Sequence, residues 1–356
     1  MGGNEMSSPP FDDDASLASR AAWLHYAGGL TQGEVAERLN IPAMKAHRLI
    51  ARAGRDGLIR IFVDGAVAEC MQFEEALKAR FKLETAQVAP DLDEPGLPLK
   101  ALAFAGASYL HAVLQRNPGQ IVGIGHGRTL AAVVRHLPTM PTSEVKFVSL
   151  LGGLTRKFSA SPFDVIHLIA ERTGSEAYLM PVPLYANSAT DRAVLLAQLG
   201  VSAVFDLARQ ADLMLVGIGE ARPSGSLVQV GMIRPDEVAE LERVGVAGEM
   251  LGHFFDARGN IIETELSGRS ISLPPEDLRG RNIVAIAGGP GKVAAIRAAL
   301  ASGLLKGLIT DELTARCLVT DDPGVMDDKK NGTSRRVKSN GKVKGVKHDG
   351  QDQGSL

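Results

Sequence analysis

The sequence has few cysteines, few aromatic residues and almost no net charge, and each shortage excludes a class of protein. Cys70 and Cys317 are the only two cysteines among 356 residues, which argues against a disulfide scaffold or a zinc site. The formal net charge is −2, so affinity for nucleic acid has to come from a local basic patch. Aromatic residues make up 4% and hydrophobic residues 45%, so the core is built mainly from Ala, Val, Leu and Ile.

Long hydrophobic runs are also missing, since no stretch approaches the roughly 18 apolar residues that span a membrane. The first residues are polar and acidic, unlike a signal peptide. We therefore expect a soluble, cytoplasmic protein without membrane contact. Residues 1–14 and 321–356 are polar and rich in small residues, which predicts disorder at both ends.

The stretch TQGEVAERLNIPAMKAHRLIAR, residues 31–52, predicts two short helices joined by a tight turn. Thr31 and Glu34 have the spacing of a capping box, Asn40 suits a left-handed turn, and Pro42 suits the start of the second helix. Such a pair is typical of a helix-turn-helix, whose second helix enters the major groove of DNA. A helical hairpin that only packs against other protein is the alternative.

The second of these helices has one apolar and one basic face. Its expected apolar stripe consists of Ala46, Leu49, Ile50 and Ala53. A basic exposed face is what the phosphate backbone of DNA selects. The residues that we expect to contact DNA are Thr31, Lys45, His47, Arg48 and Arg52.

Hydrophobic periodicity divides the chain into an all-α helix-turn-helix domain at 15–62, a connecting helix within 63–84 and an α/β effector domain at 85–320. In the first domain we expect a helix at 15–27, whose core-facing residues are Leu17, Ala21, Leu24 and Trp23, and a strand or short wing at 58–63.

The α/β domain should contain a mostly parallel sheet covered by helices, because its apolar runs do not alternate with polar residues. Expected strands are 85–89, 121–124, 145–151, 177–182, 213–218, 282–287 and 307–310. Expected helices are 99–116, 129–137, 162–173, 189–199, 203–210, 235–244 and 292–301, with one more helix after the last strand. Ligands of such sheets bind beyond the carboxyl ends of the strands.

Two loops after strands have the features of an anion site. In GIGHGRT, residues 123–129, glycines allow close backbone approach, and Arg128 and Thr129 open a helix. The loop lacks the third glycine of a dinucleotide fingerprint. In AGGPGK, which is not a Walker A loop, Lys292 begins a helix, a position unfavourable for a cation unless an anion shares the site.

Other candidate positions carry simpler alternatives. Gly152 and Gly153 end a strand, Glu220 follows another strand and is either a hydroxyl acceptor or merely solvated, and Asp256 is either a sugar ligand or a turn former. The histidines show no metal spacing and no Ser-His-Asp set can be argued. We therefore assign no catalytic residue, metal or cofactor.

Eight stretches together resemble the SorC family of sugar-responsive transcriptional regulators, which is related to the DeoR group. They lie in family order from about residue 15 to 319 and read LTQGEVAERLNI, GIGHGRTLAAV, LLGGL, AYLMPVPLYANS, ADLMLVGIGE, GHFFDARGNII, AIAGGPGKVAAIRAAL and LITDELTARCLV. The resemblance implies an effector domain similar to sugar-phosphate isomerases and deaminases, and tetramers on operator DNA. The ligand positions that it implies are Gly125, Arg128, Thr129, Gly152, Gly153, Asn187, Glu220, Asp256 and Lys292.

The sequence departs from the family pattern at two functional places. Ala43 stands where an arginine is usual in the second helix, so the operator of relatives does not transfer. His126 stands where a tryptophan is frequent, which affects the effector. Within the family the chain is most similar to regulators of polyol catabolism, erythritol included.

Together these patterns predict a repressor of a carbohydrate or polyol operon, controlled by a sugar, a polyol or a sugar phosphate. A sugar-phosphate isomerase or deaminase with a DNA-binding arm is the alternative from another class. A third possibility is a sugar-binding module whose helical arm only assembles subunits.

Overall fold

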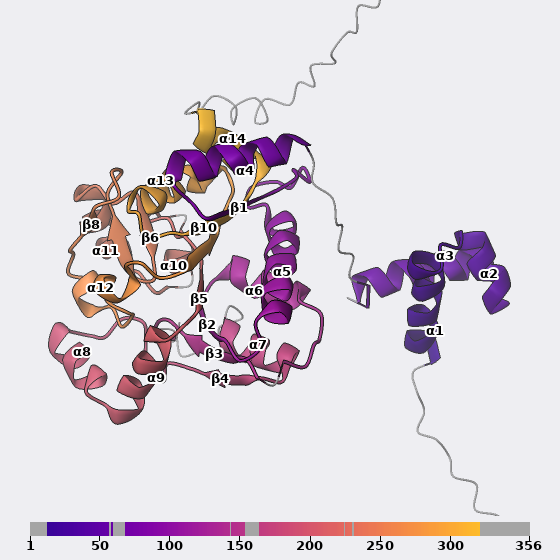
Figure 1. The fold of residues 1–356 in the computed structure, drawn as a ribbon, viewed down its shortest axis with the longest axis horizontal. Helices are drawn as coiled ribbons and strands as arrows, with labels where there is room; N and C mark the ends of the chain where they lie inside the picture. The colour runs from indigo at the N-terminus through magenta and orange to yellow at the C-terminus, as the bar shows by residue number, and fades with distance from the viewer. Residues whose placement is uncertain are drawn as a thin grey trace, which may run out of the picture.

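A computed structural model of the chain describes residues 13–56, 58–59, 68–142, 144–153, 164–223, 225–229 and 231–320. Its N-terminal part is all-helical (Figure 1), and its helices are α1 (Asp13–Ala22), η1 (Trp23–Ala27), α2 (Gln32–Leu39) and α3 (Ala43–Arg55). The prediction of disorder for residues 1–14 is wrong for Asp13 and Asp14, which begin α1. The rest of the two predicted disordered ends lies outside the described residues.

The helix-turn-helix forms as the sequence predicts. The backbone N–H of Thr31 donates to Glu34 Oε2 over 2.7 Å, and the N–H of Glu34 donates to Thr31 Oγ1 over 3.3 Å, which completes the capping box. Asn40 ends α2 in the left-handed conformation with φ 51°. The apolar stripe of α3 is buried against α1 and α2, together with Val35 and Ala36.

One expectation at the borders of this unit is wrong, and a second is mostly untested. The helix expected at 15–27 does not continue as a regular α-helix, because residues Trp23–Ala27 form a π-helical turn. Trp23 is 65% exposed and does not face the core; the smaller Ala18, Ala21 and Ala22 fill that space. Of the strand expected at 58–63, residues 58 and 59 have no regular structure, and 60–63 lie outside the described residues.

The C-terminal part is a seven-stranded sheet with strand order β1-β10-β9-β5-β2-β3-β4, in which every neighbouring pair is parallel. Its strands are β1 (Thr85–Ala89), β2 (Ile121–Ile124), β3 (Lys146–Ser149), β4 (Glu176–Tyr178), β5 (Leu213–Val216), β9 (Ile283–Ile286) and β10 (Gly307–Asp311). All seven expected strands are thus confirmed, with β3, β4, β5 and β9 shorter than predicted.

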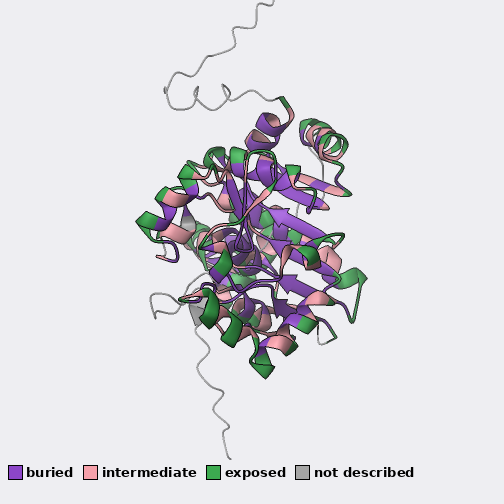
Figure 2. Ribbon diagram, turned by 90° about the vertical axis from the view of Figure 1, so that its left-hand side faces the viewer, coloured by how far each residue is buried: buried purple, intermediate pink, exposed green. Residues whose placement is uncertain are grey.

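Helices cover both faces of this sheet, and Figure 2 shows the buried strands enclosed by helices with exposed outer faces. The helices are α4 (Ala68–Phe81), α5 (Leu99–Arg116), α6 (Arg128–His136), α7 (Val165–Thr173), α8 (Ala189–Leu196), α9 (Leu199–Arg209), α10 (Ser226–Gln229), α11 (Pro235–Arg243), α12 (Pro275–Leu278), α13 (Val293–Ala301) and α14 (Glu312–Thr320), with short 3-10 turns η2 (Ser267–Arg269) and η3 (Pro290–Lys292).

Strand β5 explains why the apolar runs do not alternate. Leu213 and Leu215 pack with α5, α6 and α7 on one face, whereas Met214 and Val216 pack with α9, α11 and α13 on the other. Both sets of side chains are buried, so each position of the strand is apolar. The core therefore lies in two layers, one on each side of the sheet.

The expected connecting helix, α4, packs against the α/β unit. Leu77 is fully buried in the core beside β1, and Arg80 Nη1 donates to the carbonyl of Val319 in α14 over 2.8 Å. Arg316 of α14 donates back to Glu69 Oε1 over 2.8 Å. Figure 1 shows α4 and α14 side by side at one edge of the sheet. The domain boundaries at 62 and 84 stay predictions.

A small antiparallel sheet was not predicted. It consists of β6 (Gly248–Met250), β7 (His253–Phe255) and β8 (Ile261–Ile262), in the order β6-β7-β8. The strands have two or three residues each, too few to show a period in the sequence. Among the helices of the described ranges, none is long and apolar enough to cross a membrane.

Candidate functional site

A pocket lies beyond the carboxyl ends of the central strands, where ligands of parallel sheets bind. Its walls come from loops that follow β1, β2, β3, β4, β5 and β9, and from the small sheet. The lining residues are Leu97, Gly125, His126, Gly127, Arg128, Thr129, Leu130, Leu151, Leu184, Gly217, Ile218, Gly219, Leu227, Glu249, Leu251 and Lys292. The structure thus brings the two loops with anion-site features into one cavity.

The loop between β2 and α6 presents a helix N-terminus to this pocket. Gly125 donates its N–H to the carbonyl of Leu215, which holds the loop on β5 over 2.9 Å. Gly127 precedes α6 with φ 132°, a conformation that favours glycine. Arg128 and the buried Thr129 then form the first turn of α6, whose backbone N–H groups have no partner within the helix. This end of the pocket therefore attracts an anion.

Lys292 approaches the same cavity from the loop after β9. It is the last residue of η3, and its Nζ donates to the carbonyl of Ile218, after β5, over 2.7 Å. Burial and the charge of Arg128 lower the pKa of Lys292, while the carboxylates of Glu220 and Glu249 oppose that shift. Two carboxylates therefore favour the charged form of the ammonium group, and one guanidinium group disfavours it.

Glu249 is the pocket residue that sequence reasoning missed. It lies in β6, is 8% exposed, and accepts a hydrogen bond from the N–H of Gly252 over 2.6 Å. Its backbone pairs with that of Gly219, after β5, in both directions over 2.8 and 2.9 Å. Burial raises the pKa of Glu249 to about 7, against the opposing effects of the Gly252 N–H and Lys292. The only sequence signal was a lone carboxylate in an apolar stretch.

His126 adds a titratable group to the wall. Burial lowers the pKa of His126, and the carboxylate of Asp164 partly offsets this. Its Nδ1 is buried and has no hydrogen-bond partner among the described residues. A ring nitrogen in this state is a candidate partner for a bound hydroxyl group.

An apolar wall completes the pocket, and backbone pairing holds it in place. Gly152 lies so close to the next segment that a Cβ there would meet the Pro183 carbonyl oxygen at 2.4 Å. Gly153 exchanges backbone hydrogen bonds with Val182 and Leu184, over 2.8 and 2.9 Å. The two glycines therefore pack the segment that carries Leu184, and neither is among the lining residues.

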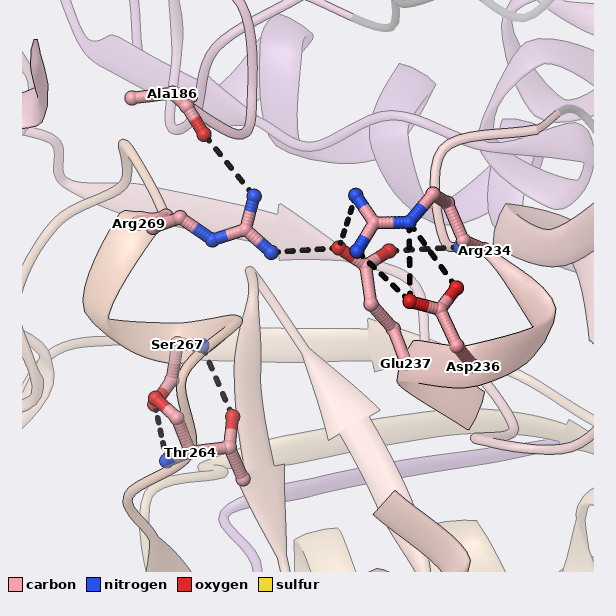
Figure 3. A network of polar contacts seen from close by, with 7 residues as sticks. All are labelled: Ala186, Arg234, Asp236, Glu237, Thr264, Ser267 and Arg269. Carbon is pink, nitrogen blue, oxygen red and sulfur yellow. Dashed lines mark hydrogen bonds and ion pairs between the residues drawn. The ribbon is translucent and has the colours of Figure 1, made fainter. Parts of the chain in front are cut away.

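A buried ion pair fixes the outer side of that segment (Figure 3). Arg269 Nη2 donates to Glu237 Oε1 over 2.6 Å, and its Nη1 donates to the carbonyl of Ala186 over 3.3 Å. Arg234 lies 3.2 Å from the same carboxylate oxygen and also pairs with Asp236. Through these contacts the pair joins α11, η2 and the chain next to Leu184. Removal of either buried partner would leave an uncompensated charge.

The structure does not bring every predicted ligand into the pocket. Asn187 is exposed and precedes α8 outside the lining residues. The carboxylate of Asp256 accepts from the N–H groups of Arg258 and Asn260, both over 2.8 Å, and from Asn260 Nδ2 over 2.9 Å. Asp256 is therefore a turn former between β7 and β8. Glu220 is not among the lining residues, but the charge of its carboxylate raises the pKa of Lys292, which lines the pocket.

Four of the predicted DNA-contacting residues lie on α3, and Thr31 directly precedes α2. His47 and Arg48 are exposed, whereas Lys45 and Arg52 are half-buried. Arg52 Nε donates to Asp56 Oδ2 over 3.0 Å at the end of α3. Thr31 is exposed, but its side chain caps α2. The helix keeps a basic outer surface, since its sequence contains four Lys and Arg residues and no acidic one.

Within the part of the chain that the structure describes, no group of three or more His, Cys, Asp or Glu side chains is placed to hold a metal ion. Both cysteines are buried and reduced. Burial and nearby carboxylates raise the pKa of Cys70 to about 11, so its thiol stays protonated and unreactive near neutral pH.

Comparison with known proteins agrees with this architecture. A model of the sugar-binding domain family (Sugar-bind) matches residues 66–320. The erythritol catabolism regulatory protein EryD of Brucella abortus (strain 2308) is 51% identical over 313 residues, which cover 88% of this chain and 99% of that protein. The transcriptional regulator LsrR of Enterobacter sp. (strain 638) is 32% identical over 311 residues, which cover 86% of this chain and 93% of that protein.

A solved structure matches both parts of the chain. The crystal structure of the full-length sorbitol operon regulator SorC from Klebsiella pneumoniae has a TM-score of 0.64 at 28% identity, and the match covers 86% of this chain and 100% of that one. The relatives are transcriptional regulators, and their similarity extends over the helix-turn-helix as well as the α/β unit. This chain therefore belongs to the SorC family of sugar-binding transcriptional regulators.

Proposed function

We propose that this chain is a cytoplasmic repressor of a polyol-catabolic operon, and that binding of its effector lowers its affinity for operator DNA. The observation that carries the proposal is the pairing of a basic recognition helix, α3, with a pocket that contains charged side chains at the carboxyl edge of the sheet. EryD, the relative that is 51% identical, is named for erythritol catabolism, which favours erythritol or a phosphate of it as the effector.

The charges of the pocket support a ligand with an anionic end and a hydroxylated end. Arg128, Lys292 and the first N–H groups of α6 attract a phosphate group. Glu220 and Glu249 provide carboxyl oxygens that accept hydrogen bonds from hydroxyl groups. We assign effector binding to Gly125, Arg128, Thr129, Lys292 and these two carboxylates, and we leave Asn187 and Asp256 out.

The path from effector to DNA begins, in this proposal, at the loop that carries Lys292. The N–H of Gly289 in that loop donates to Asp311 Oδ2 over 3.0 Å and to Thr314 Oγ1 over 2.8 Å. Thr314 belongs to α14, which packs on α4, the first helix after the DNA-binding unit. A ligand on Lys292 would act on the start of α14, and effector control requires only that ligand and DNA prefer different arrangements.

The family resemblance leads us to propose a homotetramer as the form that binds operator DNA. Light scattering of the full chain after size-exclusion chromatography tests this, with four chains per particle as the expected mass. A stable monomer would contradict the assembly but not the DNA-binding role of α3.

One observation favours the enzyme alternative. Glu249, with a pKa of about 7, is a carboxyl group that can transfer protons near neutral pH, beside Lys292 in the pocket. We nevertheless propose binding without turnover, because the relatives are regulators. Ribose phosphate and glucosamine phosphate should stay unchanged with the purified chain. Isomerisation or deamination that disappears in Glu249→Gln would put the enzyme first.

A fluorescent duplex from the region upstream of the chain's own operon tests the regulator directly. Anisotropy should show saturable binding that erythritol or erythritol phosphate reverses, while a duplex of scrambled sequence binds weakly at the same salt concentration. Binding that neither compound changes would contradict the effector assignment. Equal affinity for both duplexes would contradict operator recognition.

A further inference from the structure

Met44, the second residue of the recognition helix α3, has a large apolar side chain that points away from the protein. It is 80% exposed, whereas the apolar stripe that anchors α3 is buried in the helical core. Met44 lies three and four residues before His47 and Arg48, so the three side chains share the outer face of α3. The anchoring contacts of α3 therefore do not account for a methionine at this position.

Position and charge favour DNA as the occupant of this face. Scattered apolar residues are ordinary on protein surfaces, but N-terminal residues of a recognition helix are the ones that contact base edges. The surrounding surface is basic, because α3 contains four Lys and Arg residues and no acidic one. Attraction between these cations and the phosphates of DNA would place the helix in the major groove, where Met44 would contact the bases.

Only one group on the base edges of the major groove is apolar, the 5-methyl group of thymine. A methionine has no hydrogen to donate and adapts its flexible thioether chain to a neighbouring methyl group. We propose that Met44 contacts a thymine methyl group in each operator half-site and thereby determines sequence specificity at that position. The proposal rests on the DNA-binding role of α3 proposed above.

This contact complements the polar contacts of its neighbours on the helix. Arg48 has donors suited to the acceptors of a guanine, and His47 has a ring nitrogen for a base or a phosphate. Met44 adds discrimination that those groups do not provide, because thymine and uracil present identical hydrogen-bonding groups and differ only in the methyl group. Replacement of thymine by deoxyuridine therefore isolates the contact.

The test uses the full chain and a duplex from the region upstream of its operon, shortened to the segment that footprinting shows to be protected. Each thymine is replaced in turn by deoxyuridine, and affinity is measured by anisotropy. The wild type should lose about fourfold in affinity at one thymine of each half-site, which corresponds to ~0.8 kcal/mol for one buried methyl group. M44A should bind the native duplex more weakly and lose that sensitivity. M71A alters an exposed methionine on α4 and should match the wild type in every duplex.

Three results would overturn the proposed contact and leave the regulator function standing. A flat deoxyuridine scan with the wild type would show that no thymine methyl group is recognised. A scan for M44A that equals the wild-type scan would assign the recognised methyl group to another residue. If M44A loses the same affinity for the thymine and the uracil duplex at every position, Met44 contacts protein or the DNA backbone and not a thymine methyl group. Failure of the wild type to bind any upstream duplex would refute the regulator function itself, together with this contact.

Discussion

Replacement of Glu249 by glutamine should remove a pH dependence from the stability of the α/β unit. The substitution keeps the shape of the side chain, and the amide oxygen can still accept the hydrogen bond that Gly252 donates over 2.6 Å. What it removes is a titrating group buried in the pocket wall beside Lys292. A comparison of the two proteins at several pH values therefore isolates one carboxyl group.

The sign follows from the proton that the folded state retains. Burial raises the pKa of Glu249 from 4.5 to about 7. Between these values the folded chain keeps a proton that the unfolded chain has released, so the stabilisation is complete below pH 4.5 and disappears as the pH rises through about 7. The shift corresponds to about 3 kcal/mol, most of which is lost between pH 5 and pH 8.

Urea denaturation of both proteins across this pH range measures the effect. The difference in unfolding free energy, wild type minus Glu249→Gln, should fall by about 2 to 3 kcal/mol from pH 5 to pH 8. Taking the difference removes the contributions of other groups, such as His253, whose pKa is lowered by burial and whose effect on stability has the opposite sign. Parallel curves for the two proteins would refute the reasoning and show that Glu249 is ionised in the folded state throughout.

Three further outcomes are expected. Lys292→Ala should weaken binding of a phosphorylated effector at least tenfold, since a charge-assisted contact contributes roughly 1.5–3 kcal/mol. The affinity for neutral polyols should fall much less, and equal losses of affinity for both ligands in calorimetry would contradict this. Arg48→Ala should weaken operator binding in a gel shift at unchanged effector affinity, and the idea fails if retardation equals that of the wild type. Thr314→Val removes one acceptor of the Gly289 N–H, so the coupling between the two sites should weaken: effector and operator should each bind nearly normally, but the effector should release less DNA. Full release of DNA in an anisotropy titration would exclude the proposed path through α14.

Local patterns allowed much of the fold to be predicted. The capping box of Thr31 and Glu34 and the left-handed Asn40 depend on neighbours three or four residues away, so the sequence contains all the groups involved. The seven strands of the large sheet were found because apolar runs such as 213–216 have to be buried on both faces. The loops before α6 and α13 were found because glycines and charges follow those strands directly.

Errors occurred where a residue's role depends on partners far along the chain. Trp23 fits a helical stripe, but alanines fill the space in the helical core. Gly152 resembles a ligand loop, and only the backbone of Pro183 shows that it is a packing position.

The sequence by itself determined the helix-turn-helix, the parallel sheet and the two loops with helix N-termini, because each depends on short-range periodicity and local hydrogen bonding. Only the tertiary structure decided which groups meet in the pocket. Glu249 is 43 residues before Lys292 and 121 after Arg128 in the numbering, in a strand too short to be predicted. Its backbone pairs with Gly219 and its burial raises its pKa, and both effects arise from contacts that form when the small sheet packs on α13 and on the loop after β5.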